Sequence, residues 1–323
     1  MSEVKIITVE EKDSDSRLDR WFHRYYPQLS HGTLEKMLRG KNIKVNNAKA
    51  KADLRLKAGD LIRVPPMPTQ EEKKEHSLSQ KDIDFIKSLV LYQDKDMIAL
   101  NKPAGLAVQG GSKTTRHIDG MLAAFETNKE RPRLVHRLDK ETAGVLIIAR
   151  TVKSAAYLTK TFADKQTHKI YWALVHNCPE KMQGIIEKPL LKKANPNTNE
   201  QVVVDEQNGQ YAKTVYEVVD TTGNFSWIRL MPLTGRTHQL RVHLASIGCP
   251  IIGDEKYKGN YVDGLEKKMY LLAKAIRIPL SNGKFLKIDA PTPDYMKKSF
   301  AFFKFNDKKE QEEFNLLDVI GDL

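Results

Sequence analysis

The stretch RLVHRLDKETAGVLIIAR, residues 133–150, joins a charged loop to an apolar run. Its centre places Asp139 among His136, Arg137 and Lys140. A Thr-Ala-Gly turn follows at 142–144, and the apolar residues 145–149 predict a buried strand. Catalytic groups concentrate on loops carried by rigid strands, so Asp139 is a candidate reactive carboxylate. The alternative is a turn or cap aspartate among surface charges.

The composition is that of a soluble protein with a polyanionic partner. The 323 residues are 40% hydrophobic and 29% charged, which predicts about two domains. The net charge of +12 is concentrated near the N-terminus, since residues 16–64 hold 12 Lys and Arg against 4 Asp and Glu. A solvated basic surface is the alternative. We expect no membrane span, because no apolar run approaches about 20 residues, and no secretory signal, because residues 1–17 are polar. The two cysteines form no disulfide or metal pattern, which favours a cytoplasmic location.

The segment HRLDKETAG, residues 136–144, resembles the HRLD-x-x-[TS]-[SA]-G signature of the large-subunit ribosomal RNA pseudouridine synthases, with Ala143 where serine is usual. The resemblance implies that Asp139 is catalytic. It also implies that Arg137 fills the stack vacated by a flipped nucleotide, with His136 beside the substrate. Arg137 could equally be a surface cation. NKPAG at 101–105 also resembles the family, and Lys102 is expected to bind substrate phosphate or to be solvent-exposed.

A second motif, GRTHQLRVH at residues 235–243, lies in a segment that predicts a helix ending at Gly248. His238 and His243 are five residues apart, which is not the helical spacing of a metal-binding pair, so no metal site is expected. The motif, with the continuation ASIGCPIIGDEKY at 245–257, resembles the same family. There the arginine before Val-His pairs with the catalytic aspartate, which points to Arg241. Such a cation favours the charged carboxylate and orients it. A purely structural Asp139–Arg241 bridge is the alternative.

Two further segments complete the expected active site. HKIYWALV at 168–175 resembles the family's K-x-Y-x-A strand, which implies that Tyr171 stacks on the target base and transfers a proton. From the residues alone, Tyr171 is equally a strand aromatic in the core. YLLA at 270–273 resembles the closing motif that places an apolar side chain under the uracil. The usual histidine of that motif is Leu272 here, so either Leu271 or Leu272 is expected to contact the base.

The N-terminal region predicts a small module of two helices and a few short strands. Its order resembles the α-L RNA-binding module that is shared by a small-subunit ribosomal protein, tyrosyl-tRNA synthetase and many pseudouridine synthases. The implied RNA-binding cations are Arg39, Lys41, Lys44 and Lys49. We expect an extension at 1–15, this module at 16–64, a linker at 65–83, a catalytic domain at 84–305 and an acidic tail at 306–323. The predicted fold class is α+β, with a mixed, mainly antiparallel catalytic sheet flanked by helices.

Together the motifs imply an RNA pseudouridine synthase that flips uridine out and isomerises it, most simply in large-subunit ribosomal RNA. Such an isomerisation needs no cofactor or metal, and no nucleotide-binding signature is present. Asp139 is expected either to attack the ribose anomeric carbon or to remove the neighbouring 2′ proton. The alternatives are a tRNA-modifying relative and a non-catalytic ribosome assembly factor on the same fold. A tyrosyl-tRNA synthetase relative is disfavoured, because no ATP-binding signature appears. A monomer is expected.

Overall fold

The computed structural model describes residues 4–27, 29, 31–66, 78–111, 114–127, 130–193, 201–280 and 283–311. The chain divides into two compact units, residues 1–77 and 78–323. Most of the predicted linker, from 67 to 77, and the predicted acidic tail from 312 onward lie outside the described residues.

The first unit is a small α+β module. A four-stranded antiparallel sheet has the order β1-β4-β2-β3, and Trp21 and Phe22 of the first helix are buried beside it. β1 lies within the predicted N-terminal extension and pairs with β4, so that part of the extension belongs to the sheet. The elements are β1 (Lys5–Thr8), α1 (Leu18–Tyr25), α2 (His31–Arg39), β2 (Lys44–Val45), β3 (Ala48–Lys49) and β4 (Leu61–Val64).

The second unit carries the large sheet. Its helices are α3 (Gln80–Ser88), α4 (Ile118–Met121), α5 (Val152–Ala163), α6 (Gln239–Ser246) and α7 (Asp294–Phe303). Its strands are β5 (Val90–Gln93), β6 (Met97–Lys102), β7 (Arg133–Leu134), β8 (Ala143–Ala149), β9 (His168–His176), β10 (Gln183–Glu187), β11 (Leu190–Lys193), β12 (Gln201–Val204), β13 (Lys213–Thr222), β14 (Phe225–Pro232), β15 (Leu271–Pro279) and β16 (Phe285–Asp289).

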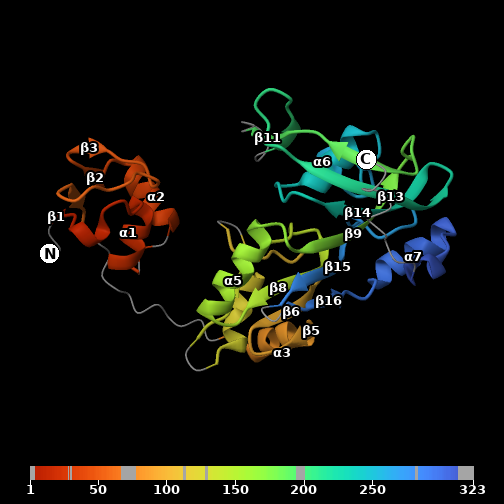
Figure 1. Cartoon of the computed structure of the whole chain (residues 1–323), viewed down its shortest axis with the longest axis horizontal. Coiled ribbons are helices and arrows are strands. Elements are labelled where there is room, and N and C mark those ends of the chain that lie inside the picture. Colours follow the sequence, from red (N-terminus) through yellow and green to blue (C-terminus); the bar gives the residue numbers. More distant parts are fainter. Residues whose placement is uncertain are drawn as a thin grey trace. The chain divides into compact units, whose positions relative to one another are not determined.

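The large sheet runs in the order β10-β13-β14-β9-β15-β8-β6-β5, with β16 paired to β15 and β7 paired to β8. Figure 1 labels the strands of this sheet from β13 to β5. β15 and β8 are parallel, and the other pairs are antiparallel. The predicted α+β class with a mixed, mainly antiparallel sheet is confirmed. β11 and β12 form a separate hairpin.

Strand β8 is buried on both faces because helices cover the sheet on each side. All seven of its residues are buried. Val145 and Ile147 point into a core that contains Trp172 and Trp227. Leu146 and Ile148 point into a second core, formed with residues of α3 and α4. Burial on both faces explains the continuous apolar run in the sequence.

Gly144 lets β8 approach β15 closely at the start of the parallel pair. Its φ is +109°, and a Cβ built on it would lie 2.1 Å from the backbone oxygen of Ala273. A side chain there would separate the two strands. The loop before β8 and the first residues of β15 therefore lie together only because residue 144 is glycine.

Candidate active site

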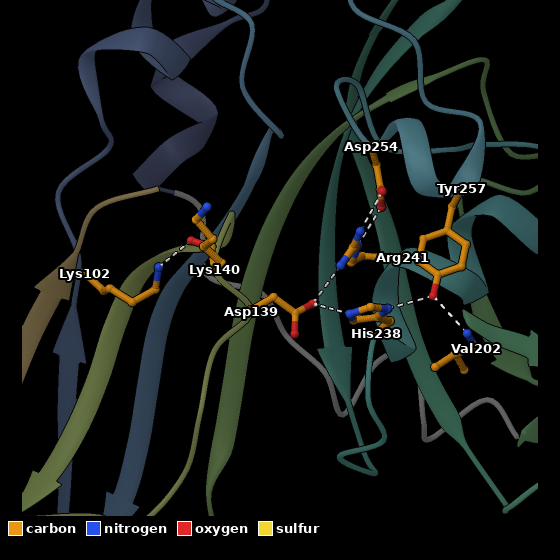
Figure 2. Close-up of polar contacts among 8 residues, drawn as sticks. All are labelled: Lys102, Asp139, Lys140, Val202, His238, Arg241, Asp254 and Tyr257. Carbon is orange, nitrogen blue, oxygen red and sulfur yellow. Dashed lines mark hydrogen bonds and ion pairs between the residues drawn. The ribbon is translucent and has the colours of Figure 1, made fainter. Parts of the chain in front are cut away.

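A cavity of about 440 Å³ opens in the second unit where the loop before β8 meets α5, β9, β15 and the N-terminal end of α6. It is lined by Val135, His136, Arg137, Leu138, Asp139, Thr142, Thr159, Phe162, Ala163, Lys169, Tyr171, Pro232, Thr234, Gly235, Arg236, Thr237, His238, Gln239, Leu240, Arg241 and Leu271. Segments far apart in the sequence thus meet around Asp139, as Figure 2 shows for several of them.

The loop that carries Asp139 is held through its backbone. The ammonium group of Lys102 donates to the backbone oxygens of Pro103 at 2.9 Å, Leu106 at 2.8 Å and Lys140 at 2.9 Å. Lys102 is fully buried and does not line the cavity. Figure 2 shows its hydrogen bond to Lys140. Burial lowers the pKa of Lys102 to about 8. The expectation that Lys102 is solvent-exposed is therefore wrong, and its ammonium group ties the residue after Asp139 to the backbone of Pro103 and Leu106.

Arg241 bridges two carboxylates. Its Nη1 donates to Oδ2 of Asp139 at 3.1 Å, while Nε and Nη2 donate to the two oxygens of Asp254, both at 2.7 Å. Arg241 and Asp254 are buried. Burial by itself lowers the pKa of Arg241. The hydrogen bonds and negative charge of Asp254, followed by those of Asp139, outweigh burial, so the net pKa of Arg241 is raised above its ordinary value. The guanidinium is therefore a permanent cation whose plane is fixed by Asp254 and whose remaining edge faces Asp139.

His238 approaches the same carboxylate from the start of α6. Its Nε2 lies 3.7 Å from Oδ2 of Asp139, and its Nδ1 lies 2.7 Å from the hydroxyl of Tyr257. Burial lowers the pKa of His238 to about 4, although the charge of Asp139 opposes this shift. The imidazole is therefore neutral near pH 7. Its residue has a φ of +54°, an uncommon conformation for a side chain other than glycine.

The segment leading into α6 is fixed by Gln239. Its side-chain oxygen accepts from Thr234 Oγ1 at 2.7 Å and from the backbone N–H of Arg236 at 3.0 Å. Its amide nitrogen donates to the backbone oxygen of Lys213 at 3.0 Å and to Thr214 Oγ1 at 2.9 Å. Gln239 therefore ties the turn before α6 to β13 and sets where His238 and Arg241 lie.

Tyr171 and Leu271 line the cavity from adjacent strands. Burial, followed by the charge of Asp139, raises the pKa of Tyr171, so its hydroxyl keeps its proton. Leu271 faces the cavity, whereas Leu272 is fully buried in the core with Trp172 on the opposite face. Of the two leucines that the sequence left open, the structure therefore places Leu271 at the cavity.

His136 and Arg137 both line the cavity, but with different freedom. His136 Nε2 accepts from the backbone N–H of Ile147 at 2.8 Å, and its ring stacks on Phe162 with centroids 4.5 Å apart. Burial, followed by the charge of Lys169, lowers the pKa of His136 to about 3. His136 therefore forms a neutral wall anchored to β8, whereas Arg137 is at the rim, where no hydrogen bond among the described residues holds its side chain.

In the first unit, two of the four predicted RNA-binding cations share a hollow. Arg39 and Lys49 line a depression of about 450 Å³ together with Arg17 and Lys51, and with the acids Asp19, Glu35 and Asp53. Lys41 and Lys44 do not line it. Lys44 Nζ instead lies 3.5 Å from Asn47 Oδ1 in the turn between β2 and β3.

The described ranges also bear on metal binding and membrane spans. Within them, no group of three or more His, Cys, Asp or Glu is arranged to hold a metal ion. No helix in that part of the chain has the length and apolar content needed to span a bilayer.

Asp254 and Tyr257 are site residues to which the sequence assigned no role. Both lie in the continuation at 245–257 that resembles the family, which was the available signal. Neither lines the cavity, and each acts on a residue that does. Their contacts join segments that are brought together only by the fold.

Comparison with known proteins identifies the family. A family model described as RNA pseudouridylate synthase matches residues 96–246, which include Asp139, Tyr171 and Arg241. Ribosomal large subunit pseudouridine synthase C of Rickettsia typhi is 38% identical over 287 residues, covering 86% of this chain and 94% of that protein. The chain belongs to the RNA pseudouridine synthase family. The family predicted from the sequence is confirmed, and the protein is an enzyme of this class.

Other pseudouridine synthases support the assignment. RNA pseudouridine synthase 4, mitochondrial, of Arabidopsis thaliana is 31% identical over 376 residues, covering 88% of this chain and 79% of that protein. The solved structure of human RNA pseudouridylate synthase domain containing 4 matches with a TM-score of 0.59 at 28% identity. That match covers 69% of this chain and 97% of the human one. The resemblance thus extends from sequence to fold.

Proposed function

We propose that this pseudouridine synthase isomerises uridine in large-subunit ribosomal RNA, with Asp139 as the reacting carboxylate. One observation carries the catalytic part of the proposal: Asp139 lines the cavity and accepts a hydrogen bond from buried Arg241 at 3.1 Å. An exposed turn aspartate would have no reason to receive a cation that is itself fixed by a second carboxylate. The substrate part rests on relatives such as the Rickettsia typhi protein, which is named for the large ribosomal subunit.

The proposed chemistry needs only groups of this chain. The bond between uracil N1 and ribose C1′ breaks, the base turns, and C5 bonds to C1′ while the C5 proton is lost to solvent and N1 gains a proton. Asp139 either attacks C1′ or removes the 2′ proton. Tyr171 and Leu271 line the same cavity and are assigned to the base, while Arg137 at the rim is assigned to the vacated stack. No oxidant, reductant or group donor enters this balance.

RNA binding is assigned to basic surfaces of both units. In the first unit, Arg39 and Lys49 line one hollow, and Lys41 and Lys44 lie on neighbouring turns and strands. Contacts from such cations to phosphate strengthen binding without reading sequence, and they weaken as salt rises. They also offset the few kcal/mol needed to flip a nucleotide out. We therefore assign much of the RNA affinity to the first unit, and the chemistry together with the contacts to the flipped nucleotide to the second.

The test is tritium release from RNA labelled at C5 of uridine, with the full chain on large-subunit rRNA and tRNA transcripts. Asp139→Asn preserves size and removes the charge. Asp263→Asn is the matched control, because Asp263 is exposed and does not line the cavity. RNA binding is measured in parallel by filter retention at two salt concentrations.

We expect wild type and Asp263→Asn to release tritium from the rRNA, and Asp139→Asn to bind the RNA without release. Release from tRNA alone would replace the proposed substrate. Tight, salt-sensitive binding without release by any variant would favour the assembly-factor alternative. Release by Asp139→Asn at the wild-type rate would reject Asp139 as the reacting group.

A further inference from the structure

Two nitrogen atoms approach the same oxygen of Asp139. Arg241 Nη1 lies 3.1 Å and His238 Nε2 lies 3.7 Å from Oδ2 (Figure 2). Among the residues that the structure describes, none donates a hydrogen bond to the side-chain oxygen Oδ1. The carboxylate is therefore held by one oxygen, and the other is left to react.

The hydroxyl of Tyr257 determines which nitrogen of His238 carries the proton. That hydroxyl accepts a hydrogen bond from the backbone N–H of Val202 at 3.3 Å, and its oxygen lies 2.7 Å from His238 Nδ1. Within the described ranges, Nδ1 is the only acceptor in reach of the phenolic proton. Tyr257 therefore donates to Nδ1. In a neutral imidazole the proton must then lie on Nε2, which faces Asp139.

We propose that His238 and Tyr257 are positioning residues: Tyr257 holds His238 as the Nε2–H tautomer, so that an N–H dipole, 3.7 Å away and beyond hydrogen-bond length, faces Oδ2 and supports the hydrogen bond by which Arg241 fixes that oxygen, leaving Oδ1 of Asp139 for the substrate. The proposal rests on the proposed function, in which Asp139 is the reacting group. The opposite tautomer would direct a lone pair at the carboxylate and repel it. That repulsion would act against the hydrogen bond from Arg241.

The surroundings of His238 fit this positioning role. Its backbone adopts the left-handed conformation, with a φ of +54°, which costs free energy for a residue other than glycine and is found most often at functional sites. The ring of Tyr257 also lies under the Arg241 guanidinium at 5.0 Å, so one tyrosine supports both groups that reach Oδ2. The charged groups facing the imidazole are Asp139, Arg241, Asp254 and Lys256. The N–H that donates to the Tyr257 hydroxyl belongs to Val202 of β12. This hydrogen bond links the separate β11–β12 hairpin to the active site.

The first measurement reads the tautomer without substrate. The full chain is labelled with ¹⁵N-histidine, and long-range ¹H–¹⁵N correlation spectra are recorded near pH 7.5 for wild type, Tyr257→Phe and His238→Asn. The His238→Asn spectrum assigns the signal, since Asn tolerates the left-handed backbone. We expect wild-type His238 to be protonated at Nε2 only. Tyr257→Phe is expected to give a mixture of both tautomers. Protonation of Nδ1 in the wild type would overturn the proposal.

The second measurement is kinetic, by tritium release. Tyr257→Phe keeps the ring under Arg241 but loses the hydroxyl, so kcat should fall about tenfold with KM for RNA nearly unchanged. His238→Asn should lower kcat at least as much, because the shorter side chain cannot reach Asp139. Tyr261→Phe is the matched control and should behave as wild type, because Tyr261 is exposed with its hydroxyl 3.5 Å from Glu255. Wild-type kcat in Tyr257→Phe would refute the role. Failure of the proposed function is distinguishable, because it would abolish release in every variant while leaving the tautomer readable.

Discussion

Replacing Arg241 by lysine tests whether the shape of the guanidinium, beyond its charge, organises the site. Arg241 makes three charge-assisted hydrogen bonds with three different nitrogens, two to Asp254 and one to Asp139. A lysine has one nitrogen at the end of a flexible stem. It can serve one carboxylate well, or lie between the two and serve both poorly.

The magnitude follows from the number of bonds lost. Each hydrogen bond between charged groups contributes about 1.5–3 kcal/mol, and Arg241→Lys keeps roughly one of the three. Part of the loss is recovered by water entering the cavity, so we expect about 2–4 kcal/mol less free energy of unfolding. If about 2 kcal/mol of that loss concerns the placement of Asp139 in the transition state, kcat falls roughly 30-fold.

Urea unfolding and tritium release with saturating RNA measure the two effects separately. Arg229→Lys is the control, because Arg229 is also buried and pairs with Glu217 at 3.2 Å but does not line the cavity. It should lose stability and keep kcat once the folded fraction is accounted for. If Arg241→Lys kept wild-type kcat, the idea that the planar guanidinium of Arg241 orients Asp139 would be refuted. If both variants lost kcat in proportion to stability, the effect would not belong to the site.

Further substitutions at Gly144, at His136 and at the pair Leu271 and Leu272 test the fold and the cavity wall. Gly144→Ala should lose about 3 kcal/mol or more in urea unfolding, because its Cβ meets a carbonyl of β15 at 2.1 Å; Gly223→Ala, with φ +55° and open space, should lose only about 1–2 kcal/mol. The pKa of His136 is lowered to about 3, so its stabilising effect is complete above its ordinary value of 6.5 and is lost as pH falls toward 3. At pH 5 the loss is at most about 2 kcal/mol, and His136→Gln, which keeps an acceptor for β8, should show a correspondingly flatter stability profile. Leu271→Ala should lower kcat/KM for tritium release, because Leu271 lines the cavity. Leu272→Ala should lose about 2–5 kcal/mol of stability and keep the activity of the folded fraction. The reverse pattern would contradict the placement of Leu271 at the cavity and Leu272 in the core.

The fold class and the family followed from local sequence, because each motif carries its own signal. The apolar run 145–149 predicts a buried strand wherever the rest of the chain lies. The choice between Leu271 and Leu272 could not follow in the same way. β15 is covered on both faces, so alternation does not distinguish the cavity side from the core side.

The supporting residues were missed for a different physical reason. A lysine after a strand predicts a surface cation or a phosphate ligand, and only the folded chain brings three carbonyl oxygens to the ammonium of Lys102. Similarly, Asp254 and Tyr257 contact Arg241 and His238 from a loop more than ten residues further along the chain. Such contacts depend on tertiary geometry, which no spacing in the sequence encodes.

The charged groups around Asp139 suit the orientation of its carboxylate and are unsuited to binding RNA phosphate. Arg241 is shared by Asp139 and Asp254, and His238 is neutral, so this group carries a net charge of about −1 and repels phosphate. Within this cavity, the cations left for a phosphate of the RNA are therefore Arg137, Lys169 and Arg236. Lys169 is the most informative of these. Burial lowers its pKa, and in the described part of the chain it has no carboxylate partner.

A buried lysine without an anionic partner is destabilised, and binding of an anion would relieve this cost. A backbone phosphate of the bound RNA would meet this need, and Lys169 lies two residues before Tyr171 on the same face of β9. We expect the base and its phosphate to be held from one strand, while Asp139 keeps its hydrogen bond from Arg241. Phosphate binding and catalysis would then use different cations, and substrate entry would not compete for the arginine that we assign to positioning Asp139.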